Sequence, residues 1–137
     1  ETLKRTERTL DALGTEGIGG KLSSGWGKFT CESVPMPAEM QRMMADKGAP
    51  CQILLSSAMP TEDELDAVLA DGHYLLARRG GYAFSEQAPS TRKRTVYLLS
   101  AGSTFSRRFH GCLVDVGLEM PHPVWRYAMA GFLGVRL

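Results

Sequence analysis

The segment Thr61-Glu62-Asp63-Glu64 is the feature that most constrains the fold of this chain. A threonine followed three residues later by a glutamate forms a capping box, in which each side chain bonds a free backbone N–H at the start of a helix. The acidic residues also suit the positive end of the helix dipole. Leu65, Val68 and Leu69 supply one apolar face, and Asp71-Gly72 ends the pattern. The sequence therefore predicts a helix over residues 61–72.

Short runs rich in apolar and β-branched residues lie on both sides of this helix and predict strands. The predicted strands are residues 28–34, 52–56, 73–77, 82–85 and 95–100. The intervening Arg78-Arg79-Gly80-Gly81 predicts a hairpin turn between the third and fourth of these, because glycine adopts the backbone angles that a tight turn needs.

Further helices are predicted where apolar residues recur at helical spacing. They are residues 1–13, 37–47, 105–114 and 124–133. Together these elements predict an α+β fold, with a small, mostly antiparallel sheet of about four strands and four to five helices packed on one face. A length of 137 residues fits a single α+β domain over residues 1–137.

Composition narrows the class of protein. The hydrophobic content of 43% and charged content of 23% are typical of a globular domain. No apolar run reaches the roughly 18 residues that a membrane helix requires, so no membrane partner is predicted. The three cysteines, Cys31, Cys51 and Cys112, are odd in number and match no zinc spacing. We expect reduced thiols, which favours a reducing intracellular compartment, and we predict no metal and no cofactor.

Charge divides the chain by position. Residues 1–72 hold 7 Lys/Arg against 12 Asp/Glu, whereas residues 73–137 hold 9 Lys/Arg against 3 Asp/Glu. Eight of the nine basic residues in the second half are arginine, which binds phosphate or carboxylate with two parallel hydrogen bonds. The second half therefore predicts a binding module for an anionic partner, with nucleic acid as the first candidate. The overall net charge of +1 is low for such a module.

The predicted nucleic-acid contacts are three basic clusters and two aromatic residues on one predicted strand. They are Arg78, Arg79, Tyr82, Phe84, Arg92, Lys93, Arg94, Arg107 and Arg108. Arg107 and Arg108 follow Ser103-Thr104, whose position before a predicted helix would offer free amides to an anion.

The segment Gly81-Tyr82-Ala83-Phe84 is similar to the core of the RNP1 motif of RNA-recognition domains. In that family, alternate aromatic residues on a strand stack on bases while a basic residue holds phosphate. Ile53-Leu54-Leu55 followed by residues 60–65 also resembles the first strand and helix entry of such a domain. The match departs from the family at Gly80, where a basic residue is usual, in a first strand without an aromatic residue, and in the short distance from Gly72 to Gly81. The sequence is not assigned to that family.

Two other classes of protein remain open. A cysteine-dependent hydrolase would use Cys51 as nucleophile with His110 or His122 as base. A protein-interaction domain would use a stripe of methionines at helical spacing, Met36, Met40, Met43 and Met44, as an adaptable docking surface.

Overall fold

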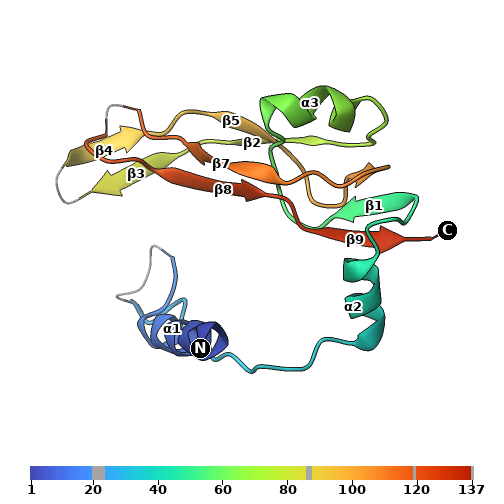
Figure 1. The fold of residues 1–137 in the computed structure, drawn as a ribbon. Helices are drawn as coiled ribbons and strands as arrows, with labels where there is room; N and C mark the ends of the chain where they lie inside the picture. The colour runs from blue at the N-terminus through green and yellow to red at the C-terminus, as the bar shows by residue number, and fades with distance from the viewer. Residues whose placement is uncertain (20–23, 86–87, 119, 137) are drawn as a thin grey trace. The chain divides into compact units, whose positions relative to one another are not determined.

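A computed structural model describes residues 1–19, 24–85, 88–118 and 120–136. These residues form three helices and nine strands (Figure 1). Contacts within the chain separate it into two compact units, Glu1–Met36 and Pro37–Leu137. Within the described ranges, no helix is both long enough and apolar enough to cross a membrane. The single-domain prediction stays a prediction.

The first unit contains one helix, α1 (Thr2–Glu16), which extends slightly beyond the predicted residues 1–13. Its leucines Leu3, Leu10 and Leu13 are exposed at the surface of the structure. The predicted strand over residues 28–34 is not a strand in the structure. A backbone hydrogen bond of 3.2 Å from Phe29 N to Gly14 O connects that segment to the end of α1.

The second unit begins with α2 (Ala38–Ala45) and contains α3 (Glu62–Leu69). Both helices were predicted from sequence, and both are confirmed. Pro37 stands directly before α2, where its missing N–H is harmless. The capping box of α3 is formed, with the Thr61 backbone N–H donating to Glu64 Oε2 at 3.1 Å.

Nine strands make four small antiparallel sheets. A three-stranded sheet has the order β6 (Thr104–Phe105), β1 (Cys51–Leu54), β9 (Phe132–Val135). The two-stranded sheets pair β2 (Leu76–Arg79) with β5 (Val96–Leu99), β3 (Tyr82–Ser85) with β4 (Ala88–Arg92), and β7 (Gly111–Asp115) with β8 (Trp125–Met129).

Two apolar clusters hold the second unit together. The first is built around three phenylalanines, Phe105, Phe109 and Phe132, whose rings meet edge to face at centroid distances of 5.5, 6.3 and 5.2 Å. Val68 of α3 and Leu54 of β1 join them. The second cluster places Val96 and Leu98 of β5 against β7 and β8. Each cluster joins strands that are distant in sequence.

The predicted fold class is wrong in its balance of helix and strand. The structure has three helices in the described residues rather than four to five on one face of a sheet. The predicted helices over 105–114 and 124–133 do not form, and strands β6 to β9 occupy parts of these segments. Trp125, Met129 and Phe132 are spaced by four and three residues, which fits one helical face. The structure instead exposes Trp125 and Tyr127 and buries Ala128, because the chain is extended there and successive side chains point to opposite faces.

The predicted turn at Arg78-Arg79-Gly80-Gly81 is also wrong. Arg78 and Arg79 belong to β2, which pairs with β5 and not with β3. Gly81 has a φ of 113°, a left-handed value that glycine adopts readily. The backbone changes direction there and continues into β3 without folding back. Three predicted strands are confirmed. The predicted strand 82–85 is β3, the predicted strand 52–56 overlaps β1, and the predicted strand 95–100 contains β5.

Candidate nucleic-acid interface

Strands β2 to β5 form one long two-stranded ribbon over residues 76–99, apart from residues 86 and 87, which lie outside the described residues. β2 continues into β3, and β4 continues into β5. A hydrogen bond of 2.8 Å from Lys93 N to Gly81 O links the two paired segments. Figure 1 shows β3 and β4 at one end of the strand layer, and β1, β9 and α2 at the other.

This ribbon brings together seven of the nine predicted contact residues. They are Arg78, Arg79, Tyr82, Phe84, Arg92, Lys93 and Arg94.

Pairing across the ribbon decides which of these side chains are neighbours. Arg78 lies opposite Tyr97, and Tyr82 lies opposite Arg92. Side chains directly opposite each other in an antiparallel pair point to the same face. Arg79 is opposite Val96, so its side chain points to the face of β2 opposite to that of Arg78. Cations thus occur along both faces of the ribbon.

The aromatic side chains of the ribbon face solvent. Tyr82 is 61% exposed and Phe84 is 85% exposed. Large exposed aromatic rings lose the stabilisation that core burial provides, so packing does not account for them. Rings presented beside arginine are the arrangement that stacks on unpaired bases.

Charge on the ribbon is largely without internal partners. The ion pairs recorded for the described residues are His110 with Glu64, and Arg136 with Asp46. Arg94 makes a hydrogen bond of 2.6 Å from Nη2 to the backbone oxygen of Asp115, and its backbone N–H donates to Val116 O at 2.8 Å. The other ribbon cations have no described carboxylate within ion-pair distance.

Arg107 and Arg108 lie away from the ribbon. Both follow β6, which pairs with β1 at the opposite end of the strand layer. Arg107 is exposed. Arg108 is turned inward: its Nε donates to Gln52 Oε1 at 2.6 Å, and its Nη1 donates to Met44 O at 2.7 Å. Arg107 and Arg108 were predicted as one cluster because they are adjacent in sequence, but their side chains have different surroundings.

The structure does not support a cysteine hydrolase. Cys51 lies on β1 opposite Val135, and the hollow beside it is lined by His73 rather than by His110 or His122. His110 is held by the Glu64 carboxylate, with 3.2 Å between Nδ1 and Oε1. No helix begins at Cys51, so the thiol gains nothing from a helix dipole. All three cysteines are unpaired.

Glu64 instead acts as a structural anchor between α3 and β7. Its carboxylate accepts hydrogen bonds from the backbone N–H groups of His110 at 2.7 Å and Gly111 at 3.2 Å. Burial alone would raise the pKa of this carboxyl, but the bonds from His110, Thr61 and Gly111 outweigh it and lower the pKa to about 2. The carboxylate is ionised at neutral pH, and its oxygens are engaged in hydrogen bonds within the fold.

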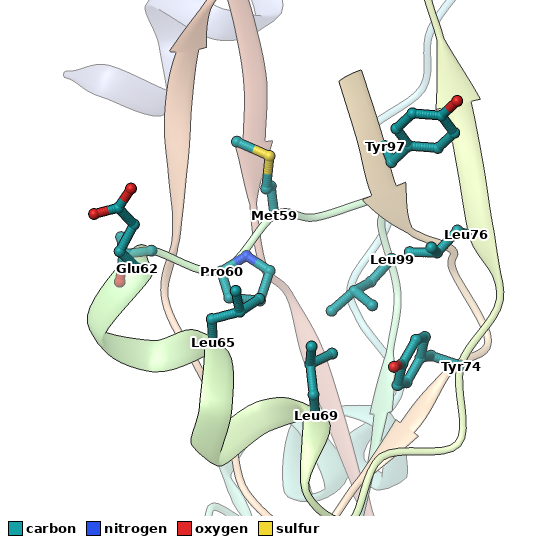
Figure 2. Close-up of a pocket in the computed structure, with 10 residues that line it drawn as sticks. Met59, Pro60, Glu62, Leu65, Leu69, Tyr74, Leu76, Tyr97 and Leu99 are labelled. Carbon is teal, nitrogen blue, oxygen red and sulfur yellow. The ribbon is translucent and has the colours of Figure 1, made fainter. Parts of the chain in front are cut away.

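An apolar groove of about 390 Å³ lies between α3 and the exposed face of β2 and β5. Figure 2 shows Leu65 and Leu69 of the helix facing Leu99, Leu76 and Tyr97 of the strands, while the Glu62 carboxylate points away from them. The groove holds no pair of groups suited to acid–base chemistry. It suits an apolar protein segment, so the protein-interaction alternative stays a prediction.

The methionine stripe is partly exposed. Met40 and Met44 of α2 are exposed, Met43 is half-buried, and Met36 belongs to the first unit. Met44 also lines a hollow of about 520 Å³ with Phe132 and Met129. A protein partner at this stripe stays a prediction. Among the described residues, no group of three or more His, Cys, Asp or Glu side chains could hold a metal ion.

A family model described as CRISPR Csm4 C-terminal domain matches residues 47–135, which is more than half of the chain. This chain belongs to that family. The matched region includes the whole ribbon, the apolar groove and the Glu64 anchor. The predicted link to nucleic acid therefore agrees with the CRISPR-associated character of the Csm4 family.

Named relatives are similar over most of the chain. It is 37% identical over 121 residues to the CRISPR system Cms protein Csm4 of Streptococcus thermophilus, a match that covers 87% of this chain and 40% of that protein. The Mycobacterium tuberculosis (strain CDC 1551 / Oshkosh) protein of the same name is 37% identical over 124 residues, covering 89% and 40%. The Methanocaldococcus jannaschii protein of that name is 27% identical over 121 residues, covering 85% and 31%. The chain thus spans less than half the length of these curated relatives.

Sequence reasoning misplaced one group of residues that lies beside the ribbon of this Csm4 domain. Trp125, Arg126 and Tyr127 were placed on a predicted helix, yet they lie on β8. Together with Lys93 they line a hollow of about 340 Å³. Their alternation of aromatic, basic and aromatic residues was the available signal, since side chains on a strand point to alternate faces.

Proposed function

We propose that this Csm4 C-terminal domain contacts single-stranded RNA along the ribbon of residues 76–99. The observation that carries the proposal is the presence of five predicted cations along the ribbon, which also exposes Tyr82 and Phe84. Arginine supplies phosphate contacts, and exposed aromatic rings supply stacking on unpaired bases. The domain needs no catalytic group for this role.

RNA is the polyanion we propose because the relatives carry the name of a CRISPR system. In RNA-guided CRISPR effectors, the protein holds the guide mainly through its backbone while base pairing reads the target sequence. A ribbon with cations on both faces and few internal partners matches contact with a phosphate backbone. Such contacts position the strand without requiring a particular base sequence.

The proposal is tested by the salt dependence of binding. Fluorescence anisotropy with a labelled oligouridine, measured over a series of KCl concentrations, gives a slope of roughly −0.7 per phosphate contacted. Arg78→Gln and Arg79→Gln are each expected to reduce the magnitude of that slope by roughly 0.7. Arg107→Gln is the matched control, since it removes one exposed arginine that follows β6, a strand that pairs with β1 and not with the ribbon.

Two results would overturn the proposal. The first is an absence of binding to RNA at low salt. The second is an equal loss of slope in the Arg79 and Arg107 variants, because that outcome would place the contact outside the ribbon. Oligodeoxythymidine measured in parallel shows whether the 2′-hydroxyl contributes.

A further inference from the structure

The apolar groove between α3 and strands β2 and β5 keeps large apolar side chains exposed to solvent. Leu65 of the helix is 40% exposed, and Leu76 and Tyr97 of the strands are 59% and 57% exposed. They meet in one groove of about 390 Å³, which is near the lower end of the roughly 300–1,000 Å³ that binding pockets occupy (Figure 2). Apolar side chains that gather in this way mark an interaction surface, whereas single exposed ones do not.

Strand pairing explains why the floor of the groove stays partly uncovered. Leu76 lies opposite Leu99, and Arg78 lies opposite Tyr97, so these four side chains share one face of β2 and β5. The other face of β5 is already filled, since Leu98 is buried in the second core cluster. Helix α3 covers the Leu99 end of the floor, where Leu99 packs in the first core cluster. Tyr97 stays exposed beyond that cover, and Arg78 does not line the groove.

Helix α3 presents three different sides. Val68 is buried in the first core cluster, while Leu65 and Leu69, one turn apart, line the groove. Glu62 and Asp66 are also one turn apart and therefore share a side of the helix. Because successive helix residues are turned by about 100°, Asp66 leaves the helix on the solvent side of Leu65. The two carboxylates thus form the outer rim of the groove, and Figure 2 shows that of Glu62 pointing away from the apolar lining.

The acids on this rim are not balanced by nearby basic residues in the sequence. Residues 61–77 hold five Asp/Glu and no Lys/Arg. Glu62 and Asp66 are exposed, and neither takes part in the ion pairs recorded for the described residues. The rim therefore repels a phosphate backbone and attracts a basic partner.

We propose that this groove docks a basic amphipathic helix of a partner protein. The apolar side chains of that helix lie between Leu65 and Tyr97, and its Lys or Arg side chains face Glu62 and Asp66. A helix bound in this way places apolar anchors at i, i+3 or i+4 and i+7 in the groove and leaves its polar side chains at the rim. The acidic rim selects a basic helix over an acidic one. This surface uses none of the side chains proposed above to contact RNA.

A pair of model peptides tests the charge and the apolar face together. A labelled helical peptide of leucine and lysine, with leucines at the anchor spacing, is titrated with the full chain of 137 residues. Its matched control has glutamate at every lysine position. Fluorescence anisotropy is expected to show saturable binding of the lysine peptide and about tenfold weaker binding of the glutamate peptide, because the rim repels it.

Methionine methyl signals locate the contact without relying on affinity. The chain has seven methionines, of which Met59 lines the groove, while Met40 and Met44 are exposed on α2. In protein labelled with ¹³C at the methionine methyl groups, the lysine peptide is expected to shift the Met59 signal with the same midpoint as the anisotropy. The signals of Met40 and Met44 are expected to stay in place.

Substitutions at the rim test the charged part of the surface. Glu62→Gln and Asp66→Asn are each expected to weaken binding of the lysine peptide about two- to fivefold and to reduce its salt dependence. Asp63→Asn is the matched control, because Asp63 is turned about 100° further round the helix than Glu62, away from the groove. We expect binding by the Asp63 variant to equal that of the unmodified chain.

A second pair of substitutions tests the apolar part. Leu65→Gln is expected to weaken binding about tenfold, because it places a polar amide where an apolar anchor is buried. Leu75→Gln is its control, since Leu75 is 77% exposed and does not line the groove. Thermal melts of every variant identify any loss of binding that comes from unfolding.

Four results would overturn the proposal. The first is an absence of binding by the lysine peptide, or equal binding of the two peptides. The second is a shift of the Met40 and Met44 signals without Met59, which would place the contact on α2. The third is a shift of Met59 by oligouridine, which would assign the groove to nucleic acid. The fourth is a dimer in sedimentation experiments that Leu65→Gln abolishes, which would assign the groove to a second copy of this chain.

Discussion

The Nε atom of Arg108 donates a hydrogen bond of 2.6 Å to Oε1 of Gln52, whose side chain is fully buried at 0% exposure. The amide nitrogen of Gln52 donates in turn to Ala49 O at 2.9 Å. The guanidinium also bonds Met44 O and Asp46 O, the free carbonyls at the end of α2. A cation there also suits the negative end of the helix dipole. Arg108 therefore joins β1, α2 and the segment after β6.

Replacement of Arg108 by leucine is expected to destabilise the protein. The change leaves Gln52 Oε1 buried without a donor and frees the carbonyls of α2. A buried acceptor without a partner costs roughly 1–3 kcal/mol, and bonds from a charged donor add to that loss. Urea denaturation followed by circular dichroism measures the change in the free energy of unfolding. Arg107→Leu is the control, and we expect it to stay within roughly 0.5 kcal/mol of the unmodified protein.

Acid should weaken the fold through Glu64. Its pKa in the folded protein, about 2, lies below the ordinary value of 4.5. A carboxyl whose pKa falls on folding stabilises the folded state above its unfolded pKa, and this contribution is lost as the pH falls through the folded value. The free energy of unfolding is therefore expected to decline between about pH 4.5 and pH 2.

The matched comparison uses two residues of α3. Glu64→Gln is expected to lower stability at neutral pH and to flatten the decline in acid, since the ionisable group is gone. Asp66→Asn removes an exposed carboxyl from the same helix and is expected to leave the profile nearly unchanged. An unaltered acid profile in Glu64→Gln would show that another group is responsible.

Substitution of Tyr82 distinguishes a contribution of its ring to RNA binding from a contribution to the stability of the fold. Because the side chain is largely exposed, Tyr82→Ala is expected to change the melting temperature little. If the ring stacks on a base, the same change weakens RNA binding by about 1–3 kcal/mol. Anisotropy and thermal melts are measured on one preparation. Tyr74→Ala, at an exposed tyrosine that precedes β2 and lies outside the ribbon, is the control for loss of an aromatic ring.

Gly134 is expected to tolerate no side chain. A Cβ atom built there would lie 2.1 Å from Asp46 O and 2.9 Å from Ala49 Cβ, because β9 packs directly against the end of α2. Gly134→Ala should destabilise the protein by about 1–3 kcal/mol, the usual effect of overpacking. Gly48→Ala adds a methyl group with its nearest neighbour at 3.9 Å. Equal melting temperatures for the two variants would contradict this account of the contact.

The helix α3 and its cap could be derived from sequence because all of the determinants lie within a dozen residues. Thr61 and Glu64 are neighbours along the chain, and the leucines that follow repeat at helical spacing. Strand β5 could also be predicted locally, because it is a short apolar run, and Val96, Leu98 and Leu99 are buried in the structure. The basic and aromatic residues from Arg78 to Arg94 could be grouped from sequence because their clusters are local, and their contact with nucleic acid stays a prediction.

The C-terminal strands could not be derived in the same way. The segment containing Trp125, Met129 and Phe132 has a spacing that a helix can bury, and local sequence does not exclude that solution. Its conformation is decided by pairing with residues 111–115 and 51–54, which are distant in sequence. Strand pairing depends on such remote partners, so its stabilisation is absent from any local window.

Tertiary structure alone also decided which cations share a surface. The sequence by itself determined that the second half of the chain is rich in arginine and poor in acid, because charge is a property of composition. It placed Arg107 and Arg108 with the other clusters on the same ground. The fold instead turns Arg108 onto Gln52 and α2, and brings Arg126 beside Lys93 across 33 residues of chain. Side-chain direction and remote strand contacts set these distances, and neither is encoded in the order of residues along a single segment.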